Sequence, residues 1–176
     1  FIDKLYDIPE LIVTISKDIK YEDIIIDFGQ GTIDSDYLYA DNISVNLGAG
    51  KASFDNIIGL DKIKFNSGTG VLNIKGGYLN NLELDMGVGS VNIDANINDE
   101  AIINGGVGEL NLNLTCIKEN YMFDISKGIG SISFDGKKQK EDNKISNGAS
   151  IIKINGGIGS INITTALEND KCIFME

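Results

Sequence analysis

"DMGVGSVNIDA", residues 85–95, joins a Gly-x-Gly pair to a run in which apolar and polar residues alternate. The pair recurs along the chain, and its first glycine falls at Gly29, Gly48, Gly68, Gly87, Gly106, Gly128 and Gly157. The successive offsets between these glycines, by subtraction, are 19, 20, 19, 19, 22 and 29 residues. A nearly constant period of about 20 residues is typical of a repeat architecture, so the repeat must be understood before any single motif.

The positions around each glycine pair carry the same residue classes in every repeat. Apolar residues recur three and five positions before the first glycine and four and six positions after it, with polar residues between them. Around Gly87 the apolar residues are Leu82, Leu84, Val91 and Ile93. This period of two on both sides of a glycine corner predicts two short strands per repeat, each with one face directed inward.

Stacking of these repeats in register predicts an all-β fold, specifically a right-handed parallel β-helix or solenoid of about seven coils. In this interpretation the glycines permit positive φ, and they leave no side chain to collide with the neighbouring coil. Apolar columns from successive coils are then sealed in one dry interior. The interpretation requires four side chains to lie together there, namely Leu84, Val91, Ile103 and Leu110.

The chain of 176 residues is interpreted as one domain. Residues 23–165 form the repeats, residues 1–22 an N-terminal cap that includes a strand at Leu11–Ile15, and residues 166–176 a C-terminal cap. Caps are expected because an exposed strand edge invites pairing with another chain. The longest offset places an insertion at residues 135–150, which is rich in lysine. We expect a solvated loop there, with a binding loop as the alternative.

Composition excludes several classes of partner. The formal net charge of -11 opposes binding to nucleic acid and to anionic lipid surfaces, whereas calcium, basic partners and simple solubility remain open. Direct membrane insertion by this segment is not expected, because no apolar run approaches the length of a membrane span. The chain opens on Phe1 and is therefore interpreted as a fragment or a processed product. Two cysteines, Cys116 and Cys172, imply no disulfide scaffold, and the sequence leaves their pairing open.

Neither phosphate nor calcium is predicted to bind at the glycine pairs. A phosphate-binding loop leads into a helix or ends in Gly-Lys-Ser/Thr, whereas each pair here leads into an alternating, strand-like run. "NGGVGELNL" and "NGGIGSINI" resemble a nonapeptide calcium repeat, but Leu110 and Ile161 stand where that repeat has aspartate. We therefore predict that the glycine pairs bend the backbone and hold no metal and no cofactor.

The acidic residues give no catalytic motif. Asp55, Asp94 and Asp135 share the position seven after the first glycine, but Lys75 and Asn113 interrupt that row, so a hydrophilic flank is expected. Other carboxylates are dispersed, including those of Asp34, Asp36, Glu83 and Asp85. The chain contains no histidine and no arginine, and no catalytic residue is predicted. A carbohydrate-active lyase or hydrolase remains the enzymatic alternative, because a pair of carboxylates can form in space without a sequence motif.

"NGGVGELNLNL", "SKGIGSISFDG", "NGGIGSINITT" and "DMGVGSVNIDA" resemble the repeats of bacterial adhesin-like domains called toast-rack, which are related to the head-GIN type. The resemblance covers roughly residues 24–165. It implies a β-solenoid in an envelope-associated, extracytoplasmic protein that is membrane-tethered through a region outside this chain, and it carries over no catalytic residue. The expected function is a non-enzymatic module that binds a protein or an envelope component. Self-assembly through the terminal coils is the third hypothesis.

Overall fold

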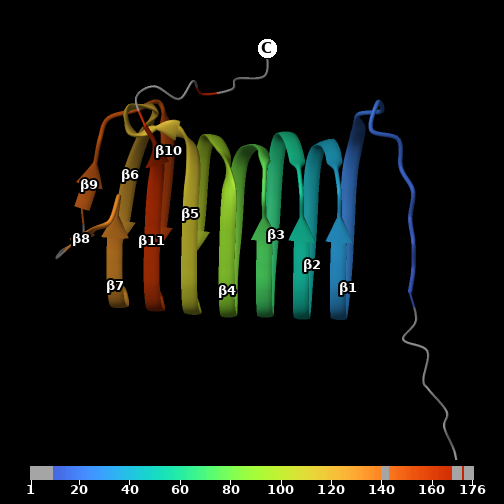
Figure 1. Ribbon diagram of the computed structural model, residues 1–176, viewed down its shortest axis with the longest axis horizontal. Helices are drawn as coiled ribbons and strands as arrows, with labels where there is room; N and C mark the ends of the chain where they lie inside the picture. Colours follow the sequence, from blue (N-terminus) through green and yellow to red (C-terminus); the bar gives the residue numbers. More distant parts are fainter. Residues whose placement is uncertain (1–9, 140–142, 168–171, 173–176) are drawn as a thin grey trace, which may run out of the picture.

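A computed structural model describes residues 10–139, 143–167 and 172 of the chain (Figure 1). The described residues form one 11-stranded sheet, most of it parallel, and a single short 3-10 helix, η1 (Lys118–Asn120). The strands are β1 (Tyr21–Ser35), β2 (Leu38–Phe54), β3 (Ile57–Ile74), β4 (Gly77–Asn104), β5 (Val107–Ile117), β6 (Tyr121–Ser126), β7 (Ile129–Phe134), β8 (Lys137–Gln139), β9 (Asn143–Ile145), β10 (Ser150–Asn155) and β11 (Ile158–Ala166). The all-β, parallel character predicted from the sequence is confirmed.

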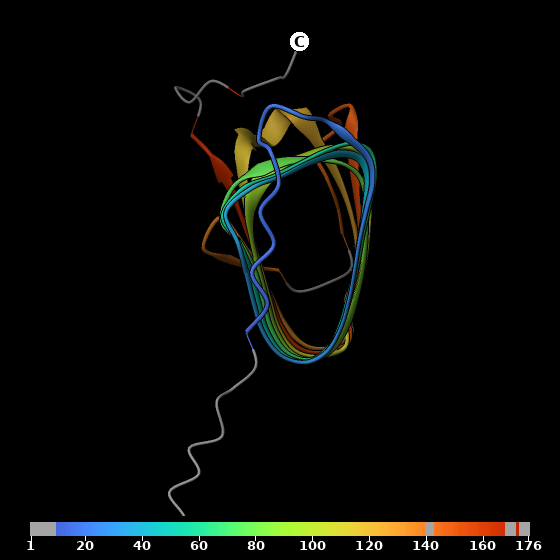
Figure 2. The same cartoon turned by 90° about the vertical axis from the view of Figure 1, so that its right-hand side faces the viewer.

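Each repeat forms one rung, defined here as a glycine pair with the strand segment before it and the strand segment after it. Seen along the long axis, the rungs superimpose on one closed outline (Figure 2). In β1 to β4 a single long strand runs through the corner, where two short strands were predicted. The corner stays in the sheet because its glycines pair with those of the next rung, as Gly31 pairs with Gly50 and Gly70 with Gly89.

The predicted apolar columns are sealed inside the stack. Leu84, Val91, Ile103 and Leu110 are all buried, with at most 2% of each residue exposed. The equivalent residues of the other rungs are buried as well, except in β1, where Ile24, Ile26 and Ile33 are only half-buried. A single rung could not bury its apolar face alone, so the buried columns show that the stack is the unit of stability.

The last two rungs do not stack in chain order. The rung built from β10 and β11 lies between the rung of β4 and β5 and the rung of β6 and β7. Its Gly159 pairs with Gly108 on one side and with Gly130 on the other. The assumption that successive repeats are spatial neighbours is therefore wrong at this end. Because all rungs share the same columns, either order satisfies the local pattern, and the 135–150 insertion supplies the chain needed to return.

The two glycines of each corner have different roles. The second glycine has a positive φ in every rung, from 127° at Gly50 to 149° at Gly130. The first glycine of the pair has a positive φ in no rung. In inner rungs, a Cβ on either glycine would collide with the neighbouring rung. A Cβ added to Gly87 would lie 1.9 Å from the carbonyl oxygen of Gly68, and one added to Gly89 would lie 1.9 Å from that of Gly70. The predicted positive φ thus holds for the second glycine only, and close stacking requires both.

The insertion at residues 135–150 forms more than the predicted solvated loop. β8 pairs antiparallel with β7, and β9 pairs antiparallel with β6. The turn between β7 and β8 places Asp135 at φ 46° and Gly136 at φ 73°, and two consecutive residues with positive φ are typical of a tight hairpin. Strands of reversed direction therefore line the outer edge of the rung formed by β6 and β7.

The first described segment lies at the opposite end of the stack. The strand predicted at Leu11–Ile15 does not form, and residues 11–20 are exposed as the chain crosses the open end in front of β1 (Figure 2). Among the described residues, β1 pairs with β2 alone. Residues 1–9, 168–171 and 173–176 of the predicted caps lie outside the described residues.

A disulfide joins Cys116 to Cys172, which settles the pairing that the sequence left open. The end of β11 lies beside the end of β5, where Ala166 pairs with Ile117. That pairing brings the chain after β11 back to Cys116, which is buried. Non-sequential stacking, which the sequence could not reveal, therefore explains why two distant cysteines meet.

Candidate binding surface

The polar column before each corner forms a ladder of amide groups across the rungs. Side-chain amides donate from Asn46 to Asp27 and from Asn66 to Asn46. Further along, the Asn104 amide donates to Asp85 at 2.7 Å, and the Asn155 amide donates to Asn104 at 2.8 Å. Each bond links neighbouring rungs, so these side chains hold the stack in register.

A second ladder follows the corner, on the polar column between the two buried ones. The Asn92 amide donates to Asn73, the Asn111 amide to Asn92, and the Asn162 amide to Asn111, each at 2.8 Å. The last bond crosses from β11 to β5 and therefore includes the rung that is out of chain order. Repeated asparagines at this position are thus explained by contacts within the stack.

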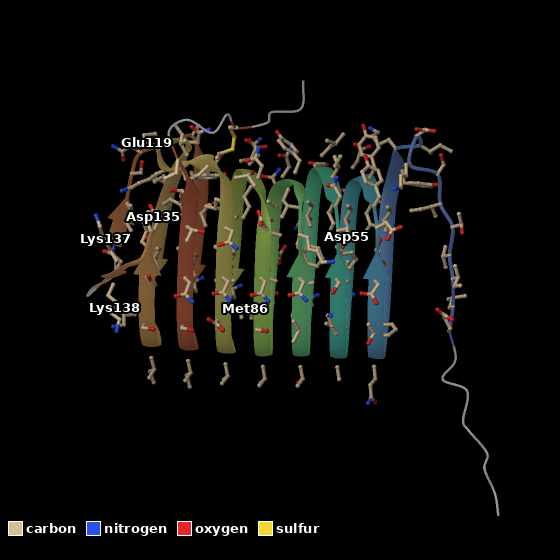
Figure 3. All side chains as sticks on the ribbon, in the orientation of Figure 1. Asp55, Met86, Glu119, Asp135, Lys137 and Lys138 are labelled. Atoms are coloured by element: carbon tan, nitrogen blue, oxygen red, sulfur yellow. A yellow bond between two sulfur atoms is a disulfide. The ribbon has the colours of Figure 1, made fainter. Side chains whose placement is uncertain are left out.

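The carboxylates singled out in the sequence are distributed along the stack. Asp55 pairs with Lys75 at 2.6 Å, and Asp135 accepts a hydrogen bond from the Thr165 backbone N–H at 2.9 Å. Figure 3 shows Asp55 and Asp135 in different parts of the stack. Asp94 lies on β4, a different rung from those of Asp55 and Asp135, so the three carboxylates do not meet at one site. Within residues 10–139, 143–167 and 172, no three side chains of the types His, Cys, Asp or Glu group as a metal ion would require.

Glu83 has the densest set of charged partners among the dispersed acids. Its carboxylate lies 2.9 Å from the Lys64 ammonium and 3.0 Å from the Lys62 ammonium. Hydrogen bonds from Lys64 and Lys62 hold the pKa of Glu83 below its ordinary value. A carboxylate stabilised in its charged form is a poor general acid, so this cluster favours a structural role over a catalytic one.

An open groove of about 590 Å³ follows the entry side of the corners in β1 to β4. Glycines and apolar or small side chains provide much of its lining, including Phe28, Leu47, Ser67 and Met86. Its two carboxylates, Asp27 and Asp85, each accept an asparagine amide from a neighbouring rung. The groove is therefore a consequence of glycine corners without side chains, and it holds no converging pair of free acids.

A buried polar side chain, Asn96, lies beside the disulfide cysteine Cys116. Asn96 is 4% exposed, and its side-chain oxygen accepts a hydrogen bond from the Tyr121 hydroxyl at 3.3 Å. Burial raises the pKa of Tyr121 to about 12, so this phenol stays protonated at neutral pH. Both side chains are buried in the stack and contact each other, so we assign this pair a structural role.

The strongest candidate for a binding surface is the middle residue of each glycine pair, which lies at the outer apex of the corner. In four neighbouring rungs this residue is a branched aliphatic side chain, 46% to 73% exposed. The strand pairings place the four in one row, Val88 beside Val107, Val107 beside Ile158, and Ile158 beside Ile129. We call these four residues the aliphatic ridge: Val88, Val107, Ile158 and Ile129.

The aliphatic ridge stands out from its surroundings for two reasons. The flanking glycines carry no side chains, so the four side chains project from the corner without cover. In the remaining rungs the same position holds Gln30, Ala49 and Thr69, so the row changes from polar to aliphatic along the stack. A contiguous exposed apolar row on an acidic protein marks an interaction site better than scattered apolar residues do.

The ridge is not predicted by the repeat pattern, because that pattern treats each glycine pair as a corner and gives no role to the residue between the glycines. The information was nevertheless present. With both flanking columns directed inward, the apex residue has to face solvent, and an aliphatic residue there in four repeats is unusual. By contrast, the predicted lack of a ligand at the glycines remains a prediction.

Comparison with known proteins gives one match. A family model described as Toastrack DUF4097 matches residues 5–141. The matched range contains the strands β1 to β8 and ends before β10, so the rung inserted out of chain order lies beyond it. Searches of curated proteins and of solved structures found no match. In the part of the chain that the structure describes, no helix has the length and apolar character needed to cross a membrane.

Proposed function

The chain belongs to the Toastrack DUF4097 family, and from this premise we propose that it is a non-enzymatic binding module of the cell envelope. The rungs form a right-handed solenoid of about seven coils, one for each glycine pair. In this proposal the solenoid is a rigid support that presents the aliphatic ridge to a protein partner. The observation that carries the proposal is the in-register row of Val88, Val107, Ile158 and Ile129.

The anatomy of the ridge fits a protein partner. Serines and asparagines of the adjoining columns border it, including Ser90, Ser160 and Asn104, and an apolar centre with a polar rim is typical of protein interfaces. The ridge is narrow, which suits a weak or transient contact better than an obligate dimer. Rung spacing of about 4.8 Å fixes the side chains in a straight line, so little conformational freedom is lost on binding.

The disulfide between Cys116 and Cys172 supports the envelope location. Disulfides persist in oxidising compartments and are rare in the reducing cytosol. In such a compartment the covalent link also stabilises the module, because it constrains the unfolded chain. The same location can be tested directly by measuring the redox state of the two cysteines in intact cells.

The placement of the acids supports a non-enzymatic role. The carboxylates of Asp55, Glu83 and Asp85 are each engaged by a lysine or an asparagine of a neighbouring rung. A glycosidase needs two carboxylates facing one sugar, one of them protonated. We propose on this basis that the surface recognises a partner without chemical turnover.

The experiment places a photo-reactive amino acid at Val107 in the complete protein in its own cells. A partner on the ridge predicts a discrete crosslinked product that disappears when Val88 and Ile158 are replaced by serine. A photo-reactive residue at Thr69, on the same apex column, is the matched control. Equal crosslinking from both positions, or persistence in the serine variant, would contradict a role for the ridge.

A further inference from the structure

We infer that copies of this chain associate head to tail, with the β1 edge of one copy docking against the β8 end of the next. This inference uses the two ends of the stack and is independent of the aliphatic ridge, so either can fail alone. The partner is a second copy of the chain. Such a heterologous contact does not close on itself and produces linear oligomers.

β1 is built like the strands of the inner rungs, but among the described strands it has a neighbour on one side only. Among the described residues, β1 pairs with β2 only, although it is 15 residues long and runs through a complete corner. A Cβ at Gly29 would meet nothing within 4 Å, whereas one at Gly48 would lie 2.3 Å from the Gly29 carbonyl oxygen. In the described part of the chain, the space that a neighbouring rung would fill is therefore open at the Gly29 corner, although residues 11–20 cross another part of the same face.

Apolar surface is concentrated at the same end. Ile25 on β1 is 69% exposed, and Leu11, Ile12 and Val13 in the preceding segment are 71% to 86% exposed. Inner rungs bury the residues equivalent to Ile24, Ile26 and Ile33, which β1 leaves half-buried. Docking of another chain would remove this surface from water, which is the main driving force for association.

The two outermost strands, β1 and β8, carry opposite charges, which favours the head-to-tail orientation. All the charged residues of β1 are acidic, namely Glu22, Asp23, Asp27 and Asp34. β8 carries Lys137 and Lys138 and no acid, and both lysines are exposed. Figure 1 places β1 and β8 at opposite ends of the long axis, and Figure 3 shows both lysines at the β8 end. Head-to-head contact would join acid to acid, whereas head-to-tail contact joins acid to lysine.

The register supports one specific ion pair. Lys138 pairs with Ser133, and Ser133 occupies the same position after its glycine pair as Asp34 does in β1. A docked β1 would thus bring Asp34 beside Lys138 on the same face. The protein already uses such pairs between neighbouring rungs: Lys75 lies 2.6 Å from Asp55, and Lys153 lies 2.6 Å from Glu100.

The test is a charge swap read by sedimentation velocity over a range of protein concentrations at low salt. Asp34→Lys and Lys138→Glu should each weaken self-association by about fivefold or more, because each replaces an exposed attraction by a repulsion. The double variant Asp34→Lys/Lys138→Glu should recover most of the parental association. Asp94→Lys on β4 and Lys51→Glu on β2 make the same charge changes at exposed positions of inner rungs, and they should leave association within twofold of the parent.

Three results would overturn the inference. The first is a parent chain that stays monomeric up to its solubility limit. The second is a Lys138→Glu variant that associates like the parent while Asp34→Lys alone alters association, since that pattern indicates head-to-head contact. The third is a double variant no better than either single variant. Circular dichroism on every variant confirms that the stack is intact, which is expected because Asp34 and Lys138 are both exposed.

Discussion

The two ends of the stack are built from the same repeat and yet differ in how much of it they bury. At the β6–β7 end, the outermost rung seals its apolar columns: Phe123 is buried completely, and Ile125, Ile132 and Phe134 nearly so. At the β1 end, Ile24, Ile26 and Ile33 occupy the same columns and remain half-buried. Side-chain identity cannot explain the difference, because both sets are large and apolar.

The difference comes from what lies beyond each outermost rung. At the β6–β7 end, β8 and β9 add strands of reversed direction, Ile145 packs against the core, and the Lys118 ammonium lies 5.3 Å from the centre of the Phe134 ring. On the inner side of this rung, a disulfide ties Cys172, after β11, to Cys116 of β5. A parallel stack can thus cover its last apolar columns by adding short strands of reversed direction, and these leave only a short edge for the head-to-tail contact proposed above.

The largest effect is expected from a charge in the sealed column. Val91→Asp should lower the free energy of unfolding by more than about 4 kcal/mol and leave the chain unfolded, because the carboxylate would be buried without a partner. Ile33→Asp, at the same position of the β1 rung, should cost about 1 kcal/mol. Urea denaturation followed by circular dichroism measures both. A Val91→Asp chain as stable as the parent would disprove the inward assignment, and equal losses would show that β1 is covered.

Removal of the disulfide should act on one end only. Replacing Cys116 and Cys172 by alanine should cost about 2–4 kcal/mol, because the bond closes a long loop in the unfolded chain. Hydrogen exchange should rise in β6, β7, β10 and β11 and stay unchanged in β1 to β3. A reducing agent should reproduce the effect in the parent and have none on the double variant. A uniform rise in hydrogen exchange along the whole stack would contradict a stabilising effect confined to this end.

Gly29 and Gly48, each the first glycine of its pair, test the effect of close stacking apart from that of backbone conformation. Gly48→Ala should cost about 1–3 kcal/mol, since the added Cβ would lie 2.3 Å from the Gly29 carbonyl oxygen and φ at this position is not positive. Gly29→Ala should leave stability unchanged or raise it by about 0.5 kcal/mol, because nothing lies within 4 Å. Thermal unfolding at low protein concentration compares them. A destabilised Gly29→Ala chain would mean that another segment occupies the open end.

The sequence was sufficient to predict the columns and insufficient to predict their order. Alternation around Gly87 places Leu84 and Val91 inside, because strand periodicity is a local property. The position of β10 and β11 is not local. Their residues fit between the β5 and β7 rungs or beyond the β7 rung equally well, so the pattern alone cannot decide between the two positions. The disulfide could not be inferred for the same reason, because Cys172 reaches Cys116 only in the order that the structure adopts.

Prediction of the site failed in a different way from prediction of the order. The ridge residues Val107 and Ile158 were visible in the sequence, but an aliphatic residue between two glycines fits a turn as readily as a binding surface. Its significance depends on exposure and on alignment with neighbours across the sheet. Exposure can be inferred from the inward direction of the flanking columns, but alignment needs the order and register of the rungs, which a list of repeats does not contain.

The smallest effect tests the asparagine ladder, for which repeat composition alone predicts that serine is nearly silent. Asn111 donates to Asn92 and accepts from Asn162 in a partly buried column, so Asn111→Ser should cost about 1 kcal/mol. Asn42 makes one exposed bond, to Asp23 at the β1 end, and Asn42→Ser should cost only a few tenths of that, about 0.3 kcal/mol. Urea midpoints of the two variants, measured side by side, resolve this difference. If both variants match the parent, the ladder follows from the register and does not contribute to it, and the stack is then held by its apolar columns and its backbone pairing alone.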